Sequence, residues 1–228
     1  MNKFSSILAA TALVATLGCG GDSTGPAVSR NSAGTGTSTM LVTADIDASN
    51  ITGGFNTDYV VSLRDAIGNP VSGAAVTISN SALGTLTLPE TVAGSGVYFN
   101  ARLSFPAGDF RLDVTRGTDN VRGVILGGPG VHTITAPANG SVAVANQAMT
   151  VKWSVPSQAK ATEVETRDFG PVALADMGSY TIAAANNPVN NNQRVRVRRY
   201  NEVDIAGGRP ASRMRVTVEN TAEPVNVQ

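Results

Sequence analysis

Few side chains in this 228-residue chain are suited to catalysis, because it has one cysteine, Cys19, and one histidine, His132. A serine nucleophile depends on a histidine base that a carboxylate orients. No G-x-S-x-G elbow precedes a helix in this sequence, and it has no Cys and His set for zinc. We therefore expect His132 to be a satisfied or exposed loop histidine, and we predict that the chain is not an enzyme and uses no cofactor.

Two carboxylates, Asp45 and Asp47, lie two residues apart in the stretch ADIDASN. Alternating oxygens of this kind are able to share a calcium ion. Side chains two apart on a strand also simply share its solvent face, and the stretch lacks the glycine-centred loop and distal glutamate of a calcium loop. The sequence favours a solvent face and leaves calcium as an alternative.

Arginines alternate with apolar residues in two stretches near the C-terminus, RVRVRR and RMRV. On strands, this spacing places the arginines on one face and buries the residues between them. If the two strands pair, five arginines form one basic stripe. They are Arg194, Arg196, Arg198, Arg213 and Arg215.

Two interpretations of this stripe stay open. An unpaired stripe would bind an acidic glycan, a lipopolysaccharide phosphate or an acidic protein surface. In the other interpretation the arginines pair across strands with carboxylates such as Glu163 and Glu165, and pairing of all five to carboxylates would exclude a glycan site. No aromatic residues are interleaved with the arginines, and 17 Lys+Arg balance 17 Asp+Glu, so we expect no nucleic-acid partner.

The first 18 residues have the proportions of a secretory signal peptide. Lys3 gives a positive start, and residues 7–17 form an apolar stretch. This stretch is shorter than the roughly 20 residues that a membrane-spanning helix needs. Cys19 follows it, at the point where a polar, glycine-rich sequence begins.

The segment TLGC resembles the lipobox of bacterial lipoproteins, in which the cysteine is lipidated and becomes the new N-terminus. Gly18 and Cys19 match that pattern, whereas Thr16 and Leu17 depart from it. The resemblance implies a lipid anchor at Cys19 in the bacterial cell envelope. Because Gly20 and not aspartate follows the cysteine, it points to the outer membrane. The alternative is an ordinary signal peptide cut nearby.

Residues 19–39 are rich in Gly, Ser and Thr and have almost no apolar content, so we predict a flexible tether. From Met40 onward, short runs alternate apolar and polar residues, as in TMLVTADI and VYFNARLSF. Turn signals such as GNP, GSG and PAGD separate these runs, and no window has a helical period. This pattern is typical of a β-sandwich, which we place over residues 40–127.

The stretches VSLRDAIGNPVSGAAVTI and GVYFNARLSFPAGDFRLDVTRG resemble bacterial immunoglobulin-like and carboxypeptidase-regulatory-like β-sandwiches. The matching residues are structural, so the resemblance implies a fold and no particular activity. Asp65, Gly68, Asn69 and Pro70 are expected to form a turn between strands.

A glycine-rich joint, GGPG at residues 127–130, ends this module. Residues 131–228 then show a second set of alternating runs, with Trp153 expected to point inward. The early tryptophan and the RVRVRRYNE and ASRMRVTV strands resemble a fibronectin type III sandwich. We therefore predict an all-β chain with two tandem immunoglobulin-like sandwiches behind a signal peptide and a linker.

These features favour a lipid-anchored, non-catalytic envelope protein with a structural or adhesive role, whose partner is an unidentified envelope protein or glycan. Binding of acidic glycan or lipopolysaccharide phosphate through the arginines is the first alternative. An accessory subunit of an envelope enzyme is the second, since a fold alone does not separate these functions.

Overall fold

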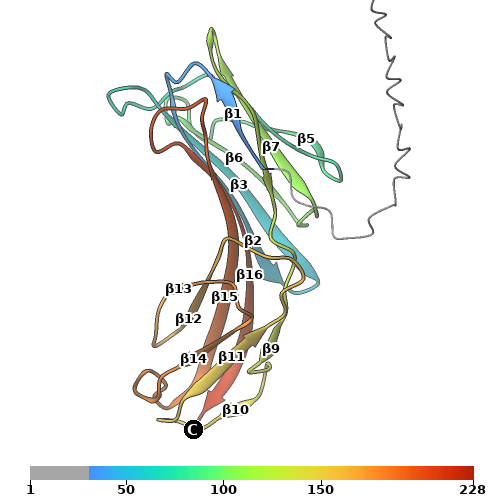
Figure 1. The fold of residues 1–228 in the computed structure, drawn as a ribbon, viewed down its shortest axis with the longest axis vertical. Helices are drawn as coiled ribbons and strands as arrows, with labels where there is room; N and C mark the ends of the chain where they lie inside the picture. Colours follow the sequence, from blue (N-terminus) through green and yellow to red (C-terminus); the bar gives the residue numbers. More distant parts are fainter. Residues whose placement is uncertain (1–30) are drawn as a thin grey trace, which may run out of the picture.

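The computed structural model describes residues 31–228, which are all β apart from one 3₁₀ turn at Ala184–Asn186. The predicted all-β class is confirmed. The predicted signal peptide, residues 1–18, and Cys19 lie outside the described residues. Two lobes follow each other along the long axis of the molecule (Figure 1).

One eight-stranded sheet runs through both lobes. Along its main path the order is β13 (Val172–Leu174), β12 (Ala161–Thr166), β15 (Asn190–Asp204), β16 (Arg213–Val227), β2 (Leu41–Ile51), β3 (Gly54–Arg64) and β6 (Val97–Arg102). The short β10 (Val142–Ala143) pairs with the end of β16. Neighbours on the main path are antiparallel except β16 and β2, which are parallel.

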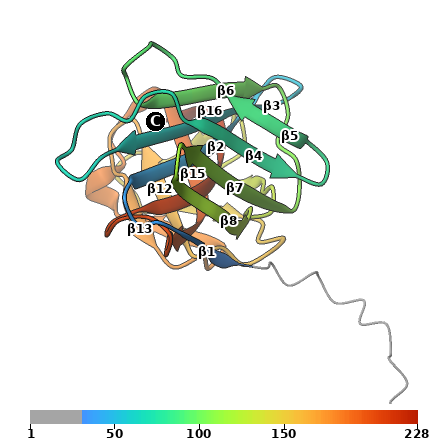
Figure 2. The ribbon, with the colours of Figure 1, turned by 90° about the horizontal axis from the view of Figure 1, so that it is seen from above.

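A five-stranded sheet completes the first lobe. Its order is β1 (Ser32–Gly36), β8 (Asp119–Gly127), β7 (Asp109–Arg116), β4 (Ala75–Asn80) and β5 (Gly84–Leu88). In Figure 2, which looks down the long axis, its strands lie beside β3 and β6 of the large sheet. The core between the sheets contains the predicted inward-facing Val42, Ala44 and Ile46, all fully buried.

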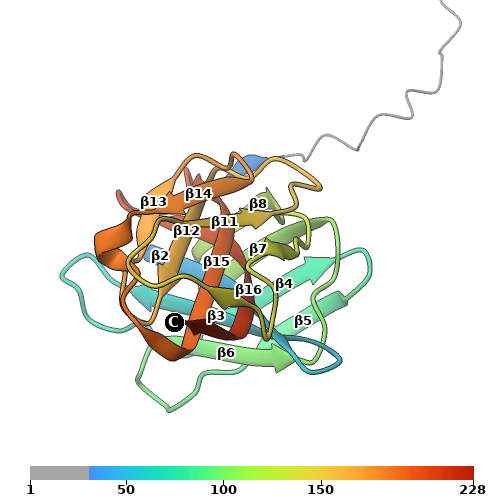
Figure 3. The ribbon, with the colours of Figure 1, turned by 90° about the horizontal axis from the view of Figure 1, so that it is seen from below.

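A three-stranded sheet completes the second lobe, in the order β14 (Ser179–Ile182), β11 (Met149–Trp153) and β9 (Ile134–Ala136). Figure 3 shows this lobe from the opposite end of the molecule. Trp153 is buried, as the sequence predicts, in a core with Val151, Val195 and Val197.

The hairpin β15–β16 contributes to the cores of both lobes. The predicted division into two modules at residues 127–131 does not account for this sharing. Val195 and Val225 belong to the core of the second lobe, whereas Ile205, Met214 and Val216 belong to that of the first. Each strand is 15 residues long and contributes residues to the cores of both lobes. The core of the second lobe is therefore built from residues within 131–228, but other residues of the same range belong to the core of the first lobe.

The predicted tether was expected to extend to residue 39, but Ser32–Gly36 forms β1 and pairs antiparallel with β8. The glycines make this possible, because a Cβ at Gly34 would lie 2.7 Å from the carbonyl oxygen of Arg122. On its other side, β1 contacts the loop between β15 and β16, where Ala206 N donates to Ala33 O at 2.9 Å. The strand is held by backbone contacts, which composition does not reveal.

The predicted turn after β3 is confirmed. One carboxylate oxygen of Asp65 accepts hydrogen bonds from the backbone N–H groups of Ile67 and Asn69, each at 2.9 Å. Gly68 has φ +88°, a conformation that glycine adopts without steric cost. These residues shape the connection between strands, as a scaffold role requires.

Candidate functional site

The outer face of the large sheet carries the five arginines that the sequence singles out. On β15, Val195 and Val197 are fully buried, and the arginines between and beside them point to the other side of the sheet. Pairing of β15 with β16 brings the arginines of both strands to one surface. We call this surface the ion-pair face and define it by Arg194, Arg196, Arg198, Arg213, Arg215 and their carboxylate partners.

On the second lobe, two glutamates bridge neighbouring arginines of this face. Glu165 lies 3.3 Å from Arg194, 3.2 Å from Arg196 and 3.0 Å from Arg198. Glu219 of β16 lies 3.0 Å from Arg196 and 2.7 Å from Arg198. Register explains these contacts, because Glu165 is the cross-strand partner of Arg196 and Glu219 that of Arg198.

Arg198 illustrates the electrostatics of this face. Partial burial disfavours its charged form, but the hydrogen bond from Nε to Glu219 and the charges of Glu219, Glu165 and Glu163 outweigh that effect. The pKa of Arg198 therefore lies above its ordinary value. The guanidinium group is stabilised by partners within the chain and needs no external anion.

On the first lobe the other two arginines are also paired. Arg213 lies 2.7 Å from Asp45 of β2, and Arg215 lies 2.7 Å from Glu202 of β15. Arg215 also stacks over the ring of Tyr200, at 4.4 Å from the ring centroid. Burial by itself would raise the pKa of Glu202. Its hydrogen bonds to Arg215 and Lys160 outweigh this effect, so the pKa of Glu202 lies below its ordinary value.

All five arginines thus have a carboxylate within 4.0 Å, and their side chains are only 19–32% exposed. Glu163 and Glu165, which the sequence suggested as partners, both take part. Pairing of all five arginines with carboxylates is the arrangement that the sequence analysis gives as excluding an unpaired basic stripe. The geometry therefore argues against an acidic glycan or phosphate site on this face.

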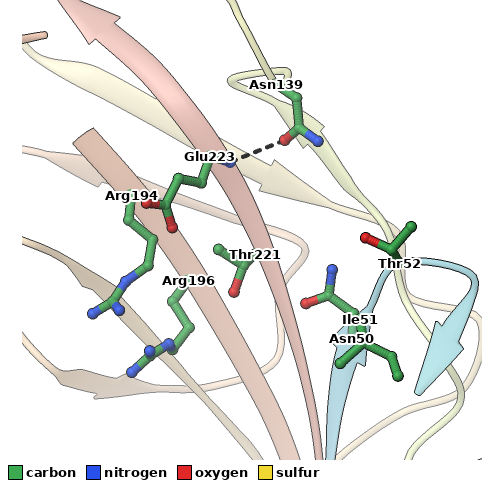
Figure 4. Close-up of a pocket in the computed structure, with 8 residues that line it drawn as sticks. All are labelled: Asn50, Ile51, Thr52, Asn139, Arg194, Arg196, Thr221 and Glu223. Atoms are coloured by element: carbon green, nitrogen blue, oxygen red, sulfur yellow. Dashed lines mark hydrogen bonds between the residues drawn. The ribbon is translucent and has the colours of Figure 1, made fainter. Parts of the chain in front are cut away.

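An open depression of about 580 Å³ lies at one end of the ion-pair face (Figure 4). Its lining is polar except for one isoleucine and consists of Asn50, Ile51, Thr52, Asn139, Arg194, Arg196, Thr221 and Glu223. Across it, Glu223 N donates to Asn139 Oδ1 at 3.0 Å. Its two arginines already contact Glu165, so the depression presents no unpaired arginine to an anion.

We expect Glu165→Gln to expose the positive charge that wild type neutralises. The variant should be retained on a heparin column to higher salt than wild type, because three arginines lose one shared carboxylate. Asp119→Asn is the control, since it makes the same charge change at the first residue of β8, away from the ion-pair face. Strong, salt-sensitive retention of wild type itself, lost on reversing Arg194, Arg196 and Arg198, would contradict a neutralised face.

A second cluster lies between the lobes, and its central residue is Arg199. This side chain is fully buried, although its neighbour Arg198 is on the outer face. Arg199 lies two residues beyond Val197 on the same strand, so strand alternation predicts that it points inward with Val195 and Val197. The prediction of a basic stripe did not use this signal. An arginine at an inward position requires a buried partner.

That partner is Asp176, which is also fully buried and lies 2.5 Å from Arg199. Its carboxylate accepts further hydrogen bonds from Trp153 Nε1 at 3.1 Å, Thr162 Oγ1 at 2.9 Å and Ala159 N at 3.0 Å. Burial raises the pKa of Asp176, but these bonds, led by that from Arg199, lower it to about 2. Nothing in the sequence identified Asp176 as this partner.

His132 lies beside this pair, in the chain segment that connects β8 to β9. It is fully buried, with Nε2 at 3.1 Å from the carbonyl oxygen of Val197. Burial, together with the charge of Arg199, lowers the pKa of His132 to about 4. A satisfied or exposed loop histidine was expected; His132 lies in a loop and is fully buried, with Nε2 satisfied by the carbonyl oxygen of Val197.

The calcium alternative finds no support in the geometry. Asp45 is engaged by Arg213, and Asp47 is the cross-strand partner of Asp58. Across residues 31–228, no three His, Cys, Asp or Glu side chains are grouped to hold a metal ion. Over the same residues, no helix combines the length and the apolar character required to cross a bilayer.

Comparisons with known proteins give a distant likeness of fold. No family model matches the chain, and no curated protein sequence matches it. Among solved structures, fibronectin(III)-like modules of Clostridium thermocellum CbhA are 16% identical, with a TM-score of 0.28 over 78% of this chain and 93% of that one. The Yersinia pseudotuberculosis adhesin InvE is also 16% identical, with a TM-score of 0.27, and the match covers 82% of this chain but only 60% of the adhesin. These likenesses bear on neither the activity nor the partner of this chain.

Proposed function

We propose that this chain is a non-catalytic, lipid-anchored protein of the bacterial cell envelope that acts as a rigid structural or adhesive module. The observation that supports this most is the β15–β16 hairpin, which runs without a break through both lobes. A shared sheet and a buried ion pair between the lobes resist bending. Such a body suits the presentation of a surface at a fixed distance from an anchor.

The absence of catalysis in this proposal rests on His132. The histidine is the chain's one candidate for the histidine base of a serine nucleophile, and it is fully buried among Val197, Arg199 and Asp176. A general base must reach the proton that it removes from a substrate. A side chain without solvent access does not meet this requirement.

The anchor is tested by Cys19→Ser. We expect wild type to sediment with membranes and to incorporate labelled palmitate, and the variant to be soluble and unlabelled, because the thiol that accepts the lipid is removed. Residues 20–30 separate Cys19 from the described part of the chain, so the substitution leaves both cores intact. A variant that stays membrane-bound would show that the lipid anchor is wrong.

The adhesive role is tested by photo-crosslinking in intact cells. A crosslinking amino acid is placed at Ile67 on the first lobe or Met177 on the second, whose residues are 83% and 78% exposed. We expect at least one position to capture an envelope protein or a second surface component. The control position is Val197, which is fully buried. Capture of nothing at exposed positions on both lobes would favour a purely structural spacer.

A further inference from the structure

The connector between β8 and β9, residues 127–133, is bound to the large sheet by side chains of the shared hairpin. Asn201 Nδ2 donates to Gly127 O at 2.8 Å, and Arg199 donates to Gly130 O at 2.9 Å. Asn220 Nδ2 donates to His132 O at 2.6 Å. The connector is therefore fastened to β15 and β16 where they pass from one lobe to the other.

His132 packs into this joint with one nitrogen satisfied and one not. Because Nε2 faces the carbonyl oxygen of Val197 at 3.1 Å, Nε2 must carry the proton and donate it. Nδ1 is then the unprotonated nitrogen, and it is buried with no hydrogen-bond partner. The joint thus holds a neutral imidazole whose basic nitrogen is buried and faces no hydrogen-bonding group of the protein.

The charges around this imidazole oppose its protonation. Arg199 of β15 contributes a fixed positive charge, and Asp176, from the segment before β14, contributes the negative one. Asp176 is already engaged by Arg199 and by three other donors. A second cation at His132 would therefore lack both a hydrogen-bond acceptor and a free counter-charge.

We propose that the joint is an acid-sensitive latch, in which protonation of His132 releases the connector, residues 127–133, from β15 and β16. A released connector exposes the imidazolium to water and takes with it the backbone acceptors of Arg199, Asn201 and Asn220. The lobes then keep their separate cores but lose the contacts that fix one against the other. The latch requires neither the lipid anchor nor a partner.

The sign and range of the effect follow from linkage. The pKa of His132 is about 4 in the closed joint and returns to about 6.5 when the side chain is exposed. Because closing of the joint lowers the pKa of His132, the neutral imidazole stabilises the closed state fully above about pH 6.5. This stabilisation is lost progressively as the pH falls toward about 4. The opening equilibrium should therefore increase by about tenfold per pH unit within that window, and by roughly 20-fold at pH 5 relative to pH 7.

Hydrogen exchange of the purified protein tests the latch. Exchange in peptides that cover residues 127–133 is compared at pH 7 and pH 5, after correction for intrinsic rates, with peptides from β3 as an internal reference. We expect the roughly 20-fold loss of protection to be confined to the connector. The control is His132→Gln, whose amide retains a donor for Val197 O but takes up no proton, so it should show no loss.

A second measurement covers the case in which His132→Gln does not fold. The wild-type chain has one histidine, so its imidazole NMR signals are assigned without ambiguity. A titration midpoint well below 6.5, accompanied by shifts of connector amides, supports the latch. A midpoint near 6.5, or a connector whose protection is unchanged down to pH 4.5, would overturn it.

Discussion

Replacing Arg199 with alanine is expected to lower the free energy of unfolding by about 3–5 kcal/mol, because it leaves the carboxylate of Asp176 buried and unpaired. The substitution also removes the donors to Gly130 O and Ser157 O, which then lie inside the joint without partners. Urea denaturation followed by tryptophan fluorescence measures the loss. Trp153, the one tryptophan, donates to Asp176 and so reports on this site directly.

Arg198→Ala is the matched control for this prediction. It removes the same side chain from the neighbouring position of the same strand, but on the ion-pair face, where Arg198 is 25% exposed. Its ion pairs are partly solvated and Glu165 retains other arginines, so the expected loss is only about 1 kcal/mol. Equal losses in the free energy of unfolding for the two variants would mean that the contribution of the Arg199–Asp176 pair to stability does not depend on its burial.

The double variant Arg199→Met with Asp176→Leu separates two explanations of a large loss. Replacement of a buried ion pair by apolar side chains is often neutral or stabilising, whereas removal of one partner is costly. We therefore expect the double variant to recover only the part of the loss that the isolated carboxylate causes, because Gly130 O and Ser157 O still lack donors. The donors Trp153 Nε1, Thr162 Oγ1 and Ala159 N also lose their acceptor. A double variant no more stable than Arg199→Ala would show that lost hydrogen bonds, and not the isolated charge, account for the loss.

Strand alternation made much of the fold predictable. Apolar residues at every second position correctly identified the inward faces of β2, β11 and β15, because burial on one side of a sheet imposes that period. The same alternation placed the arginines of β15 together and suggested Glu163 and Glu165 as their partners. Local patterns thus carried information about neighbouring strands.

Features that depend on long-range contacts were not predictable. The partner of Arg199 is 23 residues away in sequence, on a segment without a regular pattern. The parallel pairing of β16 with β2 joins residues about 170 positions apart and places the first half of β16, residues 213–219, in the first lobe. Alternation shows which side of a strand is buried, but not which core receives it.

β1 is the clearest such case, and Gly207→Ala tests how it is held. A Cβ at Gly207 would overlap the carbonyl group of Thr35 and the backbone nitrogen of Gly36. Backbone atoms cannot move aside as a flexible side chain does, so either β1 or the β15–β16 loop must shift. We expect a loss of about 1–3 kcal/mol, as for other overpacked sites. Hydrogen exchange should localise the damage to β1 and to its partner segment on β8, residues 121–125.

The control for this substitution is Gly54→Ala, at the start of β3, where no atom lies within 4 Å of the added methyl group and φ is not positive. It introduces the same group without the clash and should leave stability within about 0.5 kcal/mol of wild type. If Gly207→Ala behaves like Gly54→Ala, β1 is a loosely attached edge. If it frees β1 as expected, the three glycines at positions 34, 36 and 207 explain why a segment with the composition of a linker is part of the folded body. A pull applied at Cys19 would then reach the first lobe through β1, by way of its backbone contacts with β8 and the β15–β16 loop.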